Sequence, residues 1–198
     1  MLVIKDGDMN REKYKELLRD KAIQKNIIVN AIVLVVLICE FVAFQYTFLK
    51  GLRYLIIIEA LFVIAWKDKR EKIILNKHLI VLIGIRVLIL ICECISYPVY
   101  GKSIFASSVM GMFIGFLVFG ICYFVSRGGM GAGDVKLISV LGLYIGSADI
   151  MLVLILIASS SALFSVISLM RKKTNLKEEI PFAPFVLVGT IAAMMLGI

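Results

Sequence analysis

The sequence predicts an all-α, polytopic transmembrane helical bundle of about seven spans with a cytoplasmic N-terminus. Of its 198 residues, 61% are hydrophobic and 18% charged, and the mean hydropathy is +1.00. A soluble domain is about half apolar and about a quarter charged, so lipid is the expected solvent. The apolar residues form continuous runs rather than alternating ones, which favours helices over a membrane barrel.

Five apolar runs meet or approach the roughly 20 residues that a spanning helix needs. Two shorter runs are counted as spans that are tilted, partly re-entrant or buried by neighbours. The five are Ile27–Leu49, Leu79–Tyr97, Ile104–Val125, Ile150–Met170 and Pro181–Ile198, and the two are Leu52–Trp66 and Val135–Gly146.

The basic residues of the loops orient these spans. With the N-terminus inside, most lie in segments facing the cytoplasm, and Lys50, Arg53 and Lys102 lie outside. Removing either short span would put later basic loops on the wrong face. We therefore expect a multi-pass protein of the cell membrane.

Three parts are expected along the chain: a charged cytosolic segment (residues 1–26), an additional N-terminal transmembrane helix (27–49) and a main membrane domain (50–198). No cleavage site of a signal peptide follows the first apolar run, so we expect this end to be retained.

The net charge of +8 suggests nucleic acid, but no module that would present a basic face to it is recognisable, so no nucleic-acid partner is expected. The four cysteines lie inside apolar runs without CxxC spacing, which gives no reason to expect a metal. They are Cys39, Cys92, Cys94 and Cys122.

Two aspartates at the edges of apolar runs are the candidate catalytic residues. Asp68 follows the run Leu52–Trp66, and Asp134 comes directly before the run Val135–Gly146. Both aspartates face the cytoplasm in the expected topology. Paired carboxyl groups that share one proton can act as base and acid in amide hydrolysis. The alternatives are ordinary: Asp134 as a helix N-cap, and Asp68 as a solvated charge in a basic loop.

Glycines surround Asp134, at Gly128, Gly129, Gly131 and Gly133. They would let a substrate backbone approach closely or let the chain turn with φ > 0. A phosphate-binding loop is disfavoured, because the pattern GxxxxGK[ST] is absent.

Three segments carry a resemblance to a known family. Gly131-Ala-Gly-Asp-Val-Lys136 resembles the GxGDxK signature of the prepilin peptidases, the type IV leader peptidases. Asp68-Lys-Arg-Glu-Lys-Ile-Ile-Leu-Asn76 resembles the first-aspartate segment D-x-R-x-x-x-I-P-N, with Leu75 where proline is usual. Ile180-Pro-Phe-Ala-Pro-Phe185 resembles the segment that opens the last helix.

The resemblance implies a GxGD-type membrane aspartyl protease, with residues 50–198 as its catalytic domain. Asp68 and Asp134 would be the catalytic pair, Gly131, Gly133 and Lys136 would contact substrate, and no cofactor is implied. The substrates would be pilin-like or pseudopilin precursors whose basic leader is removed at the cytoplasmic membrane face. Which precursor, and what oligomeric state, the sequence leaves open.

Two departures from the family pattern shape the expected activity. Residues 1–26 lack the paired cysteines of the family's methyltransferase domain, so peptidase activity without N-methylation is expected. Leu75 leaves a backbone N–H and a freer φ where proline is usual, but removes no catalytic group.

Arg86 and Glu59 lie at similar depths on neighbouring antiparallel spans, so an ion pair between them is a further hypothesis. A catalytically silent membrane scaffold or a small transporter of the same fold is the alternative function. A transporter would place its polar groups near the bilayer midplane, as Glu59 and Arg86 would be.

Overall fold

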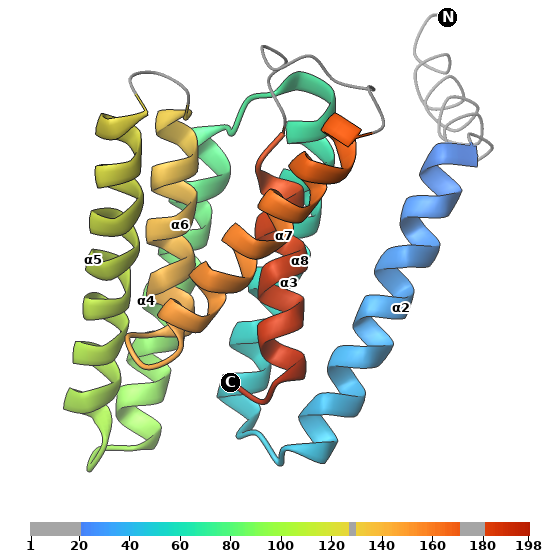
Figure 1. Ribbon diagram of the computed structural model, residues 1–198. Helices are drawn as coiled ribbons and strands as arrows, with labels where there is room; N and C mark the ends of the chain where they lie inside the picture. The colour runs from blue at the N-terminus through green and yellow to red at the C-terminus, as the bar shows by residue number, and fades with distance from the viewer. Residues whose placement is uncertain (1–20, 127–129, 171–180) are drawn as a thin grey trace, which may run out of the picture. The chain divides into compact units, whose positions relative to one another are not determined.

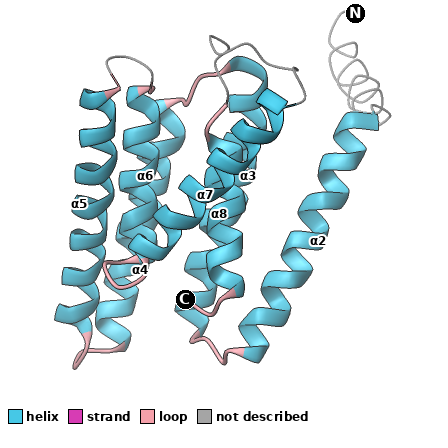
Figure 2. Cartoon of the chain, in the orientation of Figure 1, coloured by secondary structure: helices cyan, strands magenta, loops and turns pink. Residues whose placement is uncertain are grey.

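The computed structural model describes residues 21–126, 130–170 and 181–198. These residues form seven helices, and no strand is found among them (Figure 1, Figure 2). The expected all-α class is confirmed. The helices are α2 (Lys21–Ala43), α3 (Phe48–Glu71), α4 (Asn76–Ser96), α5 (Gly101–Val125), α6 (Ala132–Ile145), α7 (Ile150–Met170) and α8 (Ala183–Met195).

The chain divides into two units, residues 1–43 and 44–198. The described part of the first is α2, and residues 1–20 lie outside the described residues. The run expected over Ile27–Leu49 is two helices, because α2 ends at Ala43 and α3 begins at Phe48. Gln45 between them has φ 49°, a left-handed conformation that an α-helix cannot contain.

Helix α3 is longer than the expected run Leu52–Trp66, with 24 residues. Its charged ends were assigned to loops, but Lys, Arg and Glu are good helix formers. Lys67 and Glu71 also form an ion pair of 3.7 Å across one turn of the helix. Asp68 is therefore on a helix rather than in a loop.

Three helical segments of the described chain are long and apolar enough to cross a membrane: α4, α5 and Ile150–Ser168 of α7. Two more apolar segments, Ile28–Ala43 and Ala183–Met195, fall short of the length expected for them. The span count is roughly that expected, and the chain is a multi-pass membrane protein.

Helix α6 is short and lies buried among other helices of the second unit. It has 14 residues, about 21 Å at 1.5 Å per residue, which is less than the bilayer core. Its residues from Leu137 to Ile145 are almost all buried, and it contacts α3, α4 and α5. Of the three possibilities for this short run, burial by neighbours is the one observed.

The helices of the second unit alternate in direction, so their ends collect at two ends of the bundle (Figure 1). At one end, α3, α5 and α7 finish and α4, α6 and α8 begin. We call this the aspartate end, because it holds Asp68 and Asp134. At the opposite end, α3, α5 and α7 begin.

Candidate functional site

Asp68 lies in the last turn of α3 and is buried, with 5% of its surface exposed. Its Oδ2 accepts a hydrogen bond of 2.9 Å from the backbone N–H of Ala183, the first residue of α8. The first N–H groups of a helix have no partner within it, and the helix dipole favours a negative charge there. The start of α8 therefore holds one oxygen of the Asp68 carboxyl in place.

Asp134 occupies the third position of α6, just before the apolar run that begins at Val135. Its Oδ2 accepts a hydrogen bond of 3.2 Å from the N–H of Gly131, and its own N–H donates to the Gly131 carbonyl at 3.1 Å. The N-cap residue, which was the ordinary alternative role for Asp134, is Gly131. The carboxyl of Asp134 is fixed by a turn of its own segment.

Burial raises the pKa of Asp134 to about 6. The hydrogen bond from Gly131 opposes this shift, and the negative charge of Asp68 adds to it. The two carboxyl groups thus lie close enough to interact electrostatically, although among the described residues each has its own backbone donor and neither is bonded to the other.

Residues that follow Asp68 in the sequence pack against the segment that carries Asp134. A side chain added at Gly133 would lie 3.1 Å from Cβ of Ile74, so glycine is what allows this close approach. Two residues after Ile74, Oδ1 of Asn76 accepts a hydrogen bond of 3.2 Å from Nζ of Lys136. Residues Ile74–Asn76 therefore lie along the first turn of α6, and α8 meets α3 beside them.

The sequence profile of the type IV leader peptidase family matches residues 55–167, more than half of the chain. The chain belongs to this family. The prepilin leader peptidase/N-methyltransferase of Bacillus subtilis (strain 168) is 26% identical over 91 residues, which are 46% of this chain and 37% of that relative. The matched stretch thus covers little more than a third of the relative's length. No solved structure matches the chain.

The leader peptidase profile includes Asp68 and Asp134 but ends before α8. The resemblance read from the three segments is confirmed as to family. Ile180, which opens the third segment, lies outside the described residues. Ala183, which contacts Asp68, was not among the candidate residues, and its place in that third segment was the available signal.

Gly131 and Gly133 adopt ordinary backbone conformations beside Asp134. Neither Gly131 nor Gly133 has a positive φ, so of the two alternatives offered for the glycines a left-handed turn is not the one observed at these two positions. Gly128 and Gly129 lie outside the described residues. The observed contacts of Gly133 and Lys136 are with the chain itself, and their role toward a substrate stays a prediction.

Arg86 is fully buried in α4 and pairs with Glu93, not with Glu59 as hypothesised. Its Nη1 lies 2.9 Å from Oε2 of Glu93, two turns further along the same helix. Its other nitrogens donate to the Leu143 carbonyl at 3.0 Å and to Oγ of Ser108 at 2.7 Å. The spacing of seven residues, which places two side chains on one helix face, was the signal for this pair.

Proposed function

We propose that the chain is an aspartic endopeptidase that removes the basic leader of type IV prepilin-like precursors, with Asp68 and Asp134 as its catalytic residues. One observation carries the proposal: Asp68 and Asp134, on different helices, lie at the same end of the bundle (Figure 1), where the residues after Asp68 pack along the first turn of α6. Burial raises the pKa of Asp134, and a neighbouring carboxyl pair in which one member keeps its proton can supply both the acid and the base.

In the proposed reaction, Asp68 is the base and Asp134 holds the proton. Asp68 accepts a proton from water as the water oxygen attacks the carbonyl carbon of the scissile peptide. Asp134 donates its proton to the carbonyl oxygen, which gives a tetrahedral intermediate. The proton on Asp68 then passes to the leaving nitrogen as the C–N bond breaks, and Asp134 recovers the hydroxyl proton. Only the two carboxyl groups exchange protons.

The substrate class and membrane face rest on separate supports. The Bacillus subtilis relative is named a prepilin leader peptidase, which supports a pilin-like precursor as the substrate. The basic residues of the segment that follows α3 support a cytoplasmic position for the aspartate end. A precursor with a basic leader before an apolar helix would present its cleavage site at that level of the membrane.

The test is leader removal from a co-expressed pilin-like precursor, followed by gel shift at equal membrane abundance of each variant. Asp68→Asn and Asp134→Asn keep the side-chain shape but cannot exchange the proton. We expect each to reduce processing by at least about 10³-fold, as when a catalytic acid or base is removed. Glu71→Gln is the matched control, because Glu71 is an exposed carboxylate on the same helix as Asp68.

Processing that persists in both aspartate variants would overturn the proposal and favour a silent scaffold or a transporter of this fold. Loss of processing in Glu71→Gln as well would attribute the effect to disturbance of α3 rather than to catalysis. A wild-type protein that leaves several different pilin-like precursors uncut would argue against the substrate class.

A further inference from the structure

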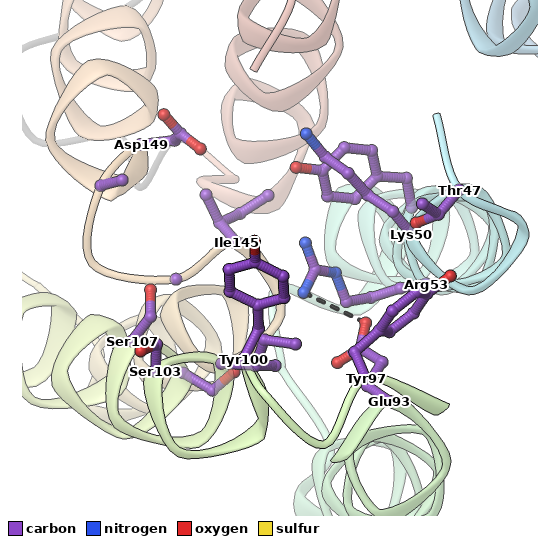
Figure 3. A pocket seen from close by; sticks show the side chains of 15 residues that line it. Thr47, Lys50, Arg53, Glu93, Tyr97, Tyr100, Ser103, Ser107, Ile145 and Asp149 are labelled. Atoms are coloured by element: carbon purple, nitrogen blue, oxygen red, sulfur yellow. Dashed lines mark hydrogen bonds and ion pairs between the residues drawn. The ribbon is translucent and has the colours of Figure 1, made fainter. Parts of the chain in front are cut away.

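A cavity of about 580 Å³ lies at the end of the bundle opposite to the aspartate end. Its walls come from the beginnings of α3 and α5, the end of α4 and the turn between α6 and α7 (Figure 3). Arg53 in this cavity and Asp68 are 15 residues apart on α3, about 22 Å at the helical rise. The cavity is therefore separate from the proposed catalytic pair and requires its own explanation.

Two hydrogen-bond donors of the cavity are buried without an acceptor in the described part of the chain: Nε of Arg53 and the hydroxyl of Tyr54. Tyr54 is only 4% exposed. Arg53 also acts on the Tyr54 hydroxyl, but neither group has an acceptor for its own proton in the described part of the chain. Buried polar groups in proteins almost always have partners, so two unsatisfied donors in one cavity point to a ligand that accepts hydrogen bonds.

Arg53 has donor capacity beyond its one ion pair. Its Nη1 lies 3.4 Å from Oε1 of Glu93, whereas the other oxygen of Glu93 holds Arg86 at 2.9 Å. A guanidinium carries five N–H groups in a fork that matches phosphate and carboxylate. Glu93 therefore occupies only part of what Arg53 can donate.

A second cation, Lys50, lies on the same side of the cavity as Arg53 (Figure 3). Its Nζ is 4.3 Å from the ring centre of Tyr46 and 5.4 Å from that of Tyr54. Lys50 precedes the apolar run of α3. Burial, and then the like charge of Arg53, lower the pKa of Lys50, while Asp149 acts in the opposite direction. An anion between Lys50 and Arg53 would relieve this repulsion.

The cavity lies at the ends of two apolar helices. It is lined by Tyr97 and Tyr100, between the end of α4 and the start of α5, and both helices are long and apolar enough to cross a membrane. The ends of such helices lie at the membrane interface, where tyrosines are enriched. An acceptor-rich anion abundant at this level is the phosphate of a phospholipid.

We propose that this cavity binds the phosphoethanolamine headgroup of a phospholipid. The phosphate would accept hydrogen bonds from Arg53 and Tyr54 and pair with Lys50. The ammonium would lie toward Asp149, which faces the two cations from the turn before α7 (Figure 3). The volume is in the range of small-ligand sites and exceeds what a phosphate ion alone would fill.

The experiment is native mass spectrometry of the delipidated full-length protein in detergent. The added ligands are dioleoylphosphatidylethanolamine, dioleoylphosphatidylglycerol and free O-phosphoethanolamine, each at the same concentrations. We expect the phosphatidylethanolamine adduct to dominate in the wild type. Arg53→Gln should weaken it by roughly tenfold, and Tyr54→Phe, which removes only a hydroxyl, by several-fold.

Lys102→Gln and Tyr123→Phe are the matched controls, because both residues are exposed and neither lines the cavity. Equal lipid binding by wild type, Arg53→Gln and Tyr54→Phe would overturn the site. If free O-phosphoethanolamine binds as tightly as the lipid, the ligand is a soluble molecule rather than a phospholipid headgroup. If the wild type binds phosphatidylglycerol as tightly as phosphatidylethanolamine, and Asp149→Asn does not change either affinity, the position assigned to the ammonium group is wrong.

Discussion

At Asp134, opposing influences act on one carboxyl group. The N–H of Gly131 favours the carboxylate, whereas burial and the charge of Asp68 favour the protonated form. Burial prevails, since the pKa is raised to about 6. In the unfolded chain the same group titrates near 3.8, so between these two values the folded protein holds a proton that the unfolded chain has released.

Because of this difference in pKa, the contribution of Asp134 to the stability of the fold should decrease as pH rises. The contribution of Asp134 is fully present below about pH 3.8 and is lost as pH rises through about 6. Thermal unfolding of the wild type and of Asp134→Asn in detergent, from pH 4 to 7, measures it. We expect the difference in melting temperature between the two to move in favour of the variant as pH rises, and a constant difference would contradict the raised pKa.

Because Arg86 and Glu93 form an ion pair, substitution of one partner should strongly lower the stability of the protein. Both side chains are almost fully buried, so Glu93→Gln leaves the charge of Arg86 poorly compensated. We expect Glu93→Gln to destabilise the protein by about 3 kcal/mol. A cycle of thermal unfolding with Arg86→Met and the double variant checks this. The double variant should lose much less than the sum of the single effects, and additive losses would show that the pair does not interact.

Which partner Arg86 takes could not be fixed from the sequence. Equal depth on antiparallel spans makes Glu59 a plausible partner, and spacing by two turns makes Glu93 another. The choice depends on which face of α4 is turned inward, and that is set by the Leu143 carbonyl and Ser108, which Arg86 also contacts. Rotation of a helix about its axis is a property of packing, not of local sequence.

Between elements, glycine allows α5 and α6 to approach to backbone contact. A side chain added at Gly111 would meet the carbonyl of Gly142 on α6, and one added at Gly142 would meet the backbone of Gly111. Small residues that let two backbones meet are a usual means of helix association in membranes. This contact holds α6, and with it Asp134, against a spanning helix.

Substitution of Gly111 therefore has a predicted direction and a control on the same helix. Gly111→Ala should destabilise the protein by about 1–3 kcal/mol, because the rigid backbone of α6 blocks the added methyl group. Gly120→Ala meets nothing within 4 Å and should be neutral or slightly stabilising, since alanine favours helix. Thermal unfolding of both variants measures the difference, and equal melting temperatures would contradict the tight contact.

The apolar runs predicted that these segments are helices, but they did not predict the residues at which the helices begin and end. The ends of α3 were misjudged because charged residues in a helix and in a loop look alike in sequence. The break before α3 depends on the conformation of Gln45, a residue type with no strong preference for a left-handed φ. The burial of α6 could be offered only as one of three possibilities, because it depends on neighbours far along the chain.

At the scale of the whole molecule, the proposed orientation predicts that the aspartate end faces the cytoplasm and that the opposite end is accessible from outside the cell. In a background without the four native cysteines, Lys77→Cys reports on the aspartate end and Lys102→Cys on the other, and both positions are exposed. We expect a membrane-impermeant maleimide to label Lys102→Cys in intact cells and Lys77→Cys only after lysis. Labelling of Lys77→Cys in intact cells would reverse the proposed orientation.

Three segments that are far apart in the chain meet at the aspartate end. The sequence could indicate this meeting only through the resemblance to a known family. The motifs indicated which residues matter, but not that Ala183 donates to Asp68 or that Ile74 packs on Gly133. The cavity at the opposite end had no sequence signal, because Lys50, Glu93 and Asp149 come from three separate segments. Such sets are defined only by tertiary structure.

The hydrogen bond between Asp68 and Ala183 joins residues 115 positions apart, and its donor belongs to the last helix of the chain. During synthesis, α3 and α6 are made before this donor exists. Until α8 is made and docked, the carboxyl of Asp68 lacks the backbone N–H that fixes it. Placement of Asp68 therefore reports that the chain has been completed to α8, and a protein released before that helix would carry both aspartates in an unfinished setting.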